Sequence, residues 1–359
     1  QTVGIQMEVP CMFSACFRRN TMSGYRRIVS SVLAVLTIFP NHCCAFIVSA
    51  AKPNLIRSTF VSSCSEGAIG GGRSIGLFCA EDMTTRTPPP KSISAPPGKS
   101  SIEEQPIRNP IDKSSVILII GGTRGIGLEF VKQCARKGAT VIATHRQKDI
   151  PFALLSLMKK DTNVQSLEME VGDEASVLKA AEEYKSRSGF EPLTHIIHSA
   201  GLYPSGSSFD GTARGGRAPV KQVTKADMME AFSVNTIGPL LVAQAFVPLL
   251  TQTKGKQMPV LAFLTSKVGS VDDNQSGGAY AYRASKSALN ILSKSLSIDL
   301  ADQARVVLLH PGYVRTDMTN GNGLIDVHES VNGMLRAIEA TDATVGFRWV
   351  DYKASLIPW

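Results

Sequence analysis

Residues 115–130, SVILIIGGTRGIGLEF, run from a continuous apolar stretch through a loop with four glycines into a second apolar stretch. Glycine loses more conformational entropy on folding than other residues, so such a loop is typical of sites where a group must approach the backbone closely. At the start of a helix that group is usually a phosphate, because unpaired N–H groups and a partial positive charge meet there. The stretch therefore predicts a buried strand, a phosphate-binding turn and a helix.

Short β-rich runs alternate with helical patterns from residue 115 onward. Repeated strand, helix, strand connections favour a parallel sheet with helices on both faces, whose ligands bind at the carboxyl ends of the strands. We therefore expect an α/β fold with a doubly wound parallel sheet, Rossmann-type and in a single domain, over residues 111–359. The predicted strands cover residues 116–120, 139–144, 164–170, 193–198, 259–265 and 306–310. The predicted helices include residues 125–137, 225–250 and 280–300.

Residues 1–110 lack this alternation and are predicted to be a mostly disordered targeting leader and proline-rich linker. The apolar run 28–39 follows two arginines and is too short to span a bilayer, as in a signal peptide. The segment that follows, up to Cys79, contains Glu66 as its only acidic residue. Together they resemble the two-part plastid leaders of algae with complex plastids, so we expect an organelle, the plastid first. Mitochondrion, secretory pathway, cytoplasm, an uninformative leader and a start at Met22 remain alternatives.

The net charge of +8 does not indicate a nucleic-acid or membrane partner. The first 110 residues hold 11 Lys and Arg against 6 Asp and Glu, which leaves 27 against 24 in the remainder. No basic stripe with interleaved aromatic residues follows, so we expect no nucleic-acid partner and no stable membrane span. Of seven cysteines only Cys134 lies beyond residue 110, which fits a reducing compartment. His195 and His198 lie three apart on a predicted strand and point to opposite faces, so we expect no metal site.

The sequence YRASK places Tyr282 and Lys286 four residues apart on a predicted helix, hence on one face. A phenol with an ordinary pKa of about 10 is a slow acid or base at neutral pH, and a nearby ammonium group stabilises the phenolate. Ser266, within LTSKVGS at the end of the preceding predicted strand, lies sixteen residues before Tyr282. Asn235 lies in FSVNTIGP on the long predicted helix. Tyr280 has no lysine four residues later, so Tyr282 is the candidate acid or base.

These stretches resemble the short-chain dehydrogenase/reductase family over nearly all of residues 115–359. The loop has the family's G-x-x-x-G-x-G spacing at Gly121, Gly125 and Gly127, unlike the wider-spaced dinucleotide fingerprint or the P-loop. The stretches FSVNTIGP, LTSKVGS, YRASK and PGYVRTDM then follow in the family's order. The resemblance implies hydride transfer between a nicotinamide cofactor and a carbonyl or hydroxyl group of a small substrate.

The same resemblance implies four catalytic roles. Tyr282 exchanges a proton with the substrate oxygen, and Ser266 hydrogen-bonds the substrate carbonyl. Lys286 lowers the pKa of Tyr282 and bonds the nicotinamide ribose, while Asn235 holds a water against the lysine and connects the proton relay to solvent.

The predicted cofactor is NADP(H), with NAD(H) as a possibility. The second predicted strand ends in VIATHR, which offers His145 and Arg146 but no carboxylate for a ribose 2′-hydroxyl. A guanidinium group binds a 2′-phosphate bidentately, and Arg124 in the glycine loop can reach the same group.

The resemblance also implies the remaining cofactor contacts. Glu170 and Val171 match the acidic-Val pair beside the adenine, and HSAG (198–201) stands where the family has Asn-Asn-Ala-Gly. The backbone of Val314 and the side chain of Thr316 match the groups that bind the carboxamide. The full expected cofactor-binding set is Gly121, Thr123, Arg124, Gly125, Ile126, Gly127, His145, Arg146, Glu170, Val171, Ala200, Gly201, Tyr282, Lys286, Pro311, Gly312, Val314 and Thr316.

The stretch KVGSVDDNQSGGAYA before Tyr282 and the C-terminal GFRWVDYKASLIPW resemble the branch that contains the bacterial C-factor signalling protein and its reductase relatives. We therefore expect an NADPH-dependent carbonyl reductase, or alternatively an NAD(P)-binding signalling or scaffold protein without essential turnover. Arg214 and Arg217 lie in the predicted loop after the fourth strand. They either bind an anionic substrate or lie in solvent. Trp359 lies either near the substrate or in the core. By analogy with relatives, a homodimer or homotetramer is expected.

Overall fold

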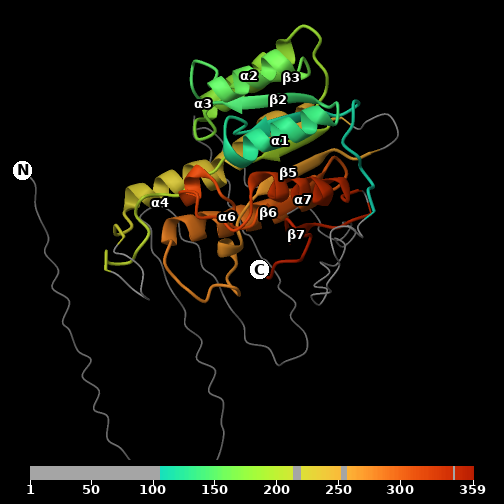
Figure 1. Cartoon of the computed structure of the whole chain (residues 1–359). Helices are drawn as coiled ribbons and strands as arrows, with labels where there is room; N and C mark the ends of the chain where they lie inside the picture. The colour runs from blue at the N-terminus through green and yellow to red at the C-terminus, as the bar shows by residue number, and fades with distance from the viewer. Residues whose placement is uncertain (1–105, 213–219, 252–256, 343) are drawn as a thin grey trace, which may run out of the picture. The chain divides into compact units, whose positions relative to one another are not determined.

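The computed structural model describes residues 106–212, 220–251, 257–342 and 344–359, so most of the predicted leader lies outside the described residues, as do Arg214 and Arg217. Within the described ranges, seven parallel strands form one sheet in the order β3-β2-β1-β4-β5-β6-β7 (Figure 1). The strands are β1 (Val116–Ile120), β2 (Thr140–His145), β3 (Val164–Glu168), β4 (His195–His198), β5 (Val260–Leu264), β6 (Arg305–His310) and β7 (Arg348–Asp351). The doubly wound α/β fold is confirmed, and each of the six predicted strands ends within two residues of the observed one.

Helices cover both faces of the sheet, because successive residues of a strand point to opposite sides. Ile117 and Ile119 of β1 belong to one apolar core with α1, α2 and α7, whereas Leu118 and Ile120 belong to a second with α3, α5 and α6. Figure 1 shows α1 and α7 packed side by side over the first core. The helices are α1 (Gly125–Arg136), α2 (Phe152–Lys160), α3 (Glu174–Ser186), α4 (Lys225–Phe232), α5 (Gly238–Phe246), α6 (Tyr280–Asp299) and α7 (Val327–Glu339).

The strand order reverses between β1 and β4. The chain moves outward from β1 to β3, then returns to the other side of β1 and continues outward to β7. The loops that follow β1 and β4 therefore diverge at one crevice, which is where ligands bind in open α/β sheets. The seventh strand was not predicted; it pairs with β6 and buries Trp349 completely.

The fold begins a few residues before the predicted start at residue 111. The backbone N–H groups of Arg108 and Asn109 both donate to the Glu339 carbonyl oxygen at 2.8 Å. The Asn109 amide also donates to the Met258 carbonyl oxygen at 3.1 Å, and Ile111 is buried. The end of the proline-rich stretch thus packs against the C-terminal end of α7.

The long helix predicted over residues 225–250 is interrupted in its middle. A π-helical segment, η2 (Ser233–Ile237), separates α4 from α5, and a 3₁₀ turn, η3 (Val247–Leu249), follows. The run from Lys225 to Leu249 is long and apolar enough to cross a membrane by length and composition. However, Val242 and Phe246 lie in the core beneath the sheet, so this helix also meets the description of a core helix.

Candidate active site

The glycine loop joins β1 to α1 and leaves no room for a side chain at Gly121 or Gly127. Gly121 has φ +80°, and a Cβ on it would lie 3.0 Å from the backbone of Ala200, in the loop after β4. A Cβ on Gly127 would lie 2.0 Å from the Gly121 carbonyl oxygen. Gly127 therefore allows the helix to close onto the loop itself. Gly125 has φ +52° and faces the Thr316 methyl group at 3.6 Å. Such a bare cradle fits a pyrophosphate at the start of a helix.

A cleft of about 700 Å³ opens at the carboxyl ends of the strands. Five of the eighteen expected cofactor residues do not line it: Tyr282, Lys286, Pro311, Gly312 and Val314. A Cβ on Gly312 would meet the side chains of Ile325 and Tyr352 at 2.9 Å, so this glycine serves the packing of its own loop. Thirteen predicted cofactor residues do line the cleft: Gly121, Thr123, Arg124, Gly125, Ile126, Gly127, His145, Arg146, Glu170, Val171, Ala200, Gly201 and Thr316.

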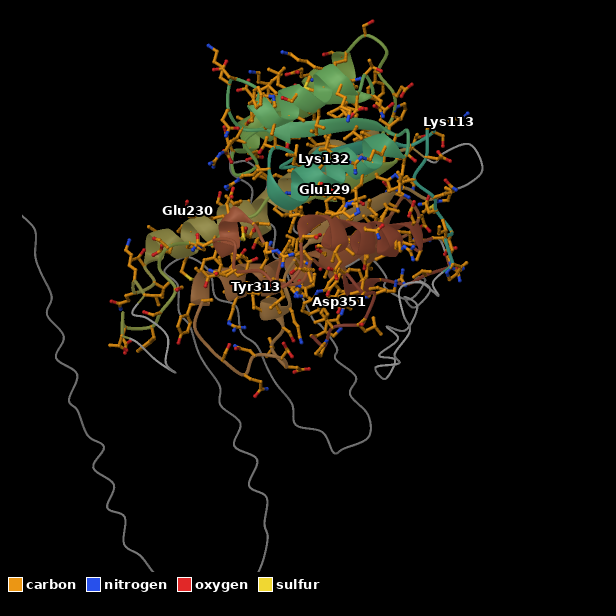
Figure 2. The ribbon with its side chains drawn as sticks, viewed as in Figure 1. Lys113, Glu129, Lys132, Glu230, Tyr313 and Asp351 are labelled. Carbon is orange, nitrogen blue, oxygen red and sulfur yellow. The ribbon has the colours of Figure 1, made fainter. Side chains whose placement is uncertain are left out.

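The cleft also has lining residues that sequence reasoning missed. Glu230 of α4 and Val234 of the π segment belong to it, and Figure 2 labels Glu230 on that helix. The signal for Val234 was its position directly before Asn235, and Glu230 lies one helical turn earlier. Met169 and Asp317 line it as well.

The two arginines expected at the 2′-phosphate differ in their surroundings. Arg146 is exposed, lines the cleft and has no hydrogen bond or ion pair with any described residue. The Arg124 guanidinium instead forms a salt bridge with Asp317, with Nη1 and Oδ2 at 2.9 Å. His145 is buried, and its Nδ1 lies 2.7 Å from the Gln147 carbonyl oxygen, so one ring nitrogen is already engaged by the backbone. Arg146 is therefore the cation most available to a ligand.

Ser266, Tyr282 and Lys286 gather at the end of β5 and the first turns of α6. Ser266 follows β5 directly and precedes a 3₁₀ turn, η4 (Lys267–Gly269), where its Oγ accepts from the Val268 N–H at 3.4 Å. The Ser266 side chain also lies near enough to the Tyr282 hydroxyl to lower the pKa of that phenol. Lys286 is buried and donates from Nζ to the Leu264 carbonyl oxygen at 3.0 Å.

The pKa of Tyr282 is shifted in the direction opposite to the sequence expectation. Burial raises the pKa of Tyr282 to about 12, the hydrogen bond from Ser266 lowers it, and the neighbouring Tyr203 raises it. Lys286 is not among the groups that shift this pKa. Its Nζ lies over the ring face, 5.7 Å from the centroid, and donates to the Leu264 carbonyl oxygen. Burial also lowers the pKa of Lys286 to about 8. At neutral pH the phenol is therefore a proton donor and the amine lies close to its titration point.

Asn235 uses its whole amide group to hold backbone and helix together. Its Oδ1 accepts from the Leu202 N–H at 2.8 Å, and its Nδ2 donates to the Leu202 carbonyl oxygen at 2.9 Å and to Ser285 Oγ at 3.0 Å. The residue is completely buried. It therefore fixes the loop after β4 next to α6, and its role in a proton relay stays a prediction.

Residues 115–323 match the sequence profile of the family described as short chain dehydrogenase. This chain belongs to the short-chain dehydrogenase family. It is thus an NAD(P)-dependent oxidoreductase, as expected from the sequence.

Several relatives resemble this short-chain dehydrogenase over most of their own length. The C-signal of Myxococcus xanthus is 43% identical over 138 residues, which cover 38% of this chain and 81% of that protein. An uncharacterized oxidoreductase of Schizosaccharomyces pombe is 30% identical over 267 residues, 68% of this chain and 98% of its own. Among solved structures, the NADPH-bound carbonyl reductase from chicken fatty liver is 30% identical with a TM-score of 0.58, covering 68% of this chain and 94% of its own. The carbonyl reductase Sniffer of D. melanogaster is 28% identical with a TM-score of 0.60, covering 68% and 99%.

In this short-chain dehydrogenase, His198 occupies the place of the family's first asparagine without disturbing the sheet. Strand β4 pairs in parallel with β1 and β5, with His198 opposite Ile120 and Phe263. His195 and His198 are both buried, and burial lowers the pKa of each to about 4 and about 3. Both imidazoles are therefore neutral. Among the described residues, no three His, Cys, Asp or Glu side chains gather as a metal ligand set.

Trp359 packs on the C-terminal strand and on the stretch that precedes Tyr282. Its ring stacks on Phe347, with centroids 5.7 Å apart, and lies against Trp349 at 5.3 Å. Its carbonyl oxygen accepts from the Asp272 N–H at 2.9 Å. The ring remains 51% exposed, so it is not a core residue. The tryptophan thus tethers the loop between Ser266 and Tyr282.

Proposed function

We propose that this short-chain dehydrogenase is an NADPH-dependent carbonyl reductase that converts small carbonyl compounds to alcohols. The proposal rests on the observation that the cleft and the group of residues around Lys286 meet at Gly201. Gly201 lines the cleft, and a Cβ placed on it would lie 3.6 Å from Lys286 Nζ and 3.5 Å from Asn235 Oδ1. The cleft with the glycine loop and the group around Lys286 therefore share one wall.

NADP(H) fits the residues that line this cleft. The side-chain-free cradle of Gly121, Gly125 and Gly127 would hold the pyrophosphate, and the unpaired guanidinium of Arg146 would hold the 2′-phosphate. The chicken carbonyl reductase, 30% identical, is described as NADPH-bound, which supports the same cofactor here. The bound cofactor supplies the hydride for the carbonyl carbon. NAD(H) lacks the 2′-phosphate and would bind more weakly.

Tyr282 is suited to the reductive direction. A pKa of about 12 keeps the phenol protonated at neutral pH but makes it a weak acid, so donation to the carbonyl oxygen depends on the negative charge that develops there. Ser266, whose side chain influences the pKa of Tyr282, would donate to the same oxygen. Lys286, with a pKa of about 8, would return a proton to the phenolate. Asn235 holds the wall of the site in place through Leu202 and completes the proposed relay.

The experiment compares the parent chain with Tyr282→Phe in assays of NADPH oxidation over a panel of aldehydes, ketones and quinones. We expect Tyr282→Phe to keep its NADPH affinity, measured by fluorescence titration, and to lose turnover by about 100-fold or more. Tyr280→Phe, two residues earlier on the same helix, is the matched control and should keep full activity. Undiminished turnover in Tyr282→Phe would refute the assignment.

The 43% identity to the C-signal of Myxococcus xanthus favours a second candidate function. In this alternative the chain binds NAD(P) as a signalling or scaffold protein without essential turnover. A pure scaffold needs the glycine loop but does not need Tyr282 or Lys286. Tight NADPH binding with no oxidation over the whole substrate panel would favour this alternative.

We propose further that the chain forms a homodimer or homotetramer and works in an organelle, the plastid first. Ile291 and Ile298 lie seven residues apart on one face of α6 and are 66% and 44% exposed. Light scattering of the parent chain and of Ile291→Glu tests the assembly, which the charge should weaken. Imaging of a reporter fused to residues 1–110 tests the compartment.

A further inference from the structure

Tyr203 lies against the proposed proton donor. The centroids of its ring and the Tyr282 ring are 4.9 Å apart, with 42° between their planes. Tyr203 is 44% exposed, whereas Ser266, another neighbour of Tyr282, is buried. Tilted aromatic pairs at this distance attract one another through their ring quadrupoles. Tyr203 thus borders the open approach to Tyr282.

The position of Tyr203 is fixed by the backbone around it. Leu202, its neighbour, is held at both its N–H and its carbonyl oxygen by Asn235. Three residues after Tyr203, the Gly206 N–H donates to the Asp227 carboxylate at 3.1 Å. The next carbonyl in the chain, that of Ser207, accepts from the N–H of Ala279 at 2.7 Å, directly before α6. The loop that carries Tyr203 is therefore anchored to α4, to the π segment and to the start of α6.

A substrate carbonyl that reaches Tyr282 from the side of the exposed Tyr203 ring places its substituent beside that ring. From this arrangement we infer that Tyr203 is a specificity-determining residue that favours carbonyl compounds with a flat aromatic substituent over saturated ones. The inference rests on the proposed carbonyl reductase function. A flat ring stacks on Tyr203 in an offset geometry, whereas a puckered saturated ring of the same size makes fewer contacts with it.

Two aldehydes isolate this effect, because benzaldehyde and cyclohexanecarbaldehyde carry six-membered carbon rings that differ in flatness and aromaticity. The quantity measured is the ratio of their kcat/KM values, in full-length protein with NADPH. A change of this ratio between variants cancels the intrinsic reactivity of each aldehyde. We expect Tyr203→Leu to lower the ratio of benzaldehyde to cyclohexanecarbaldehyde by about threefold to tenfold. Tyr203→Phe keeps the ring and should keep the ratio.

Tyr280→Leu is the matched control. Tyr280 is 43% exposed, as Tyr203 is, but its ring pairs with Phe209 at 6.2 Å and not with Tyr282. This variant should leave the ratio unchanged. Circular dichroism and NADPH titration verify that each variant folds, and Tyr203→Met replaces Tyr203→Leu if the latter does not.

The outcomes separate the two proposals. If the parent chain reduces both aldehydes and Tyr203→Leu leaves their ratio unchanged, the role of Tyr203 is overturned while the reductase function stands. If the ratio falls equally in Tyr280→Leu, the effect is general to the site entrance and the role of Tyr203 is also overturned. If the parent chain reduces no carbonyl compound, the reductase function falls and the inference falls with it.

Discussion

Replacing Gly127 by alanine tests whether the glycine loop is built for close backbone contact. A Cβ at this position would lie 2.0 Å from the Gly121 carbonyl oxygen and 2.9 Å from its carbonyl carbon. Both are backbone atoms, so no side-chain rotation relieves the overlap. The loop would have to move by about 1 Å to restore the shortest contact that real Cβ atoms tolerate.

Two effects of opposite sign compete in the Gly127→Ala variant. Alanine is favoured over glycine inside a helix by about 1 kcal/mol. Overpacking costs about 1–3 kcal/mol, and a backbone overlap of this size belongs at or above the upper end of that range. The overlap therefore wins, and we expect the free energy of unfolding to fall by about 2 kcal/mol. The displaced Gly121 carbonyl also narrows the cradle, so the dissociation constant for NADPH should rise by about tenfold, a loss of about 1.4 kcal/mol.

Urea unfolding and fluorescence titration with NADPH measure the two quantities on the full chain. Gly346→Ala is the control, because a Cβ there meets no heavy atom within 4 Å and its φ is ordinary. We expect Gly346→Ala to change neither quantity appreciably. A Gly127→Ala protein that is as stable as the parent and binds NADPH with the same affinity would refute the close-contact reasoning.

Three further predictions address the cofactor, the buried amine and the loop anchor. Arg146→Asp should raise the KM for NADPH about tenfold while the KM for NADH hardly changes. Arg124→Ala should raise the KM for NADPH by less, because Arg124 is paired with Asp317. An unchanged ratio of kcat/KM for the two cofactors in Arg146→Asp would contradict this prediction. Burial lowers the pKa of Lys286 from 10.5 to about 8, so between these pH values this amine binds more protons in the unfolded chain and its own contribution to stability rises with pH. Lys286→Met should abolish that rise in the free energy of unfolding, and a rise of undiminished size would rule out the buried amine as its source. Asn235→Ala loses both hydrogen bonds to the Leu202 backbone and should lower the free energy of unfolding by about 2–3 kcal/mol, which an unchanged melting temperature by calorimetry would disprove.

The fold could be predicted from the sequence because its strands are continuous apolar runs separated by helical patterns. Strand β7 was not predicted, because Arg348–Asp351 is four residues long and only two of these residues are fully buried. The π segment at Ser233–Ile237 was not predicted either, because apolar periodicity shows which residues face the core and not how many residues each turn contains.

The sequence predicted which residues form the candidate site better than it predicted their pKa shifts and ion pairs. Motif spacing identified Tyr282 and Lys286, but the sign of the pKa shift of Tyr282 depends mainly on burial and on the neighbouring Ser266 and Tyr203. The sequence shows only that the two residues share a helix face. The pairing of Arg124 with Asp317 joins residues 193 positions apart, so no local pattern could indicate that one arginine is occupied and Arg146 is not.

The π segment between α4 and α5 determines in which direction around the helix axis the side chains of α5 point. Each residue added to a helix rotates the following side chains by about 100° around the axis. Asn235 is hydrogen-bonded to Leu202 while Phe246 lies in the core, and removing one residue between them would rotate one side chain relative to the other by about 100°. A single-residue deletion within Ser233–Ile237 would therefore be harmful for a reason unrelated to helix length, because it would turn either the amide or the apolar face away from its partner.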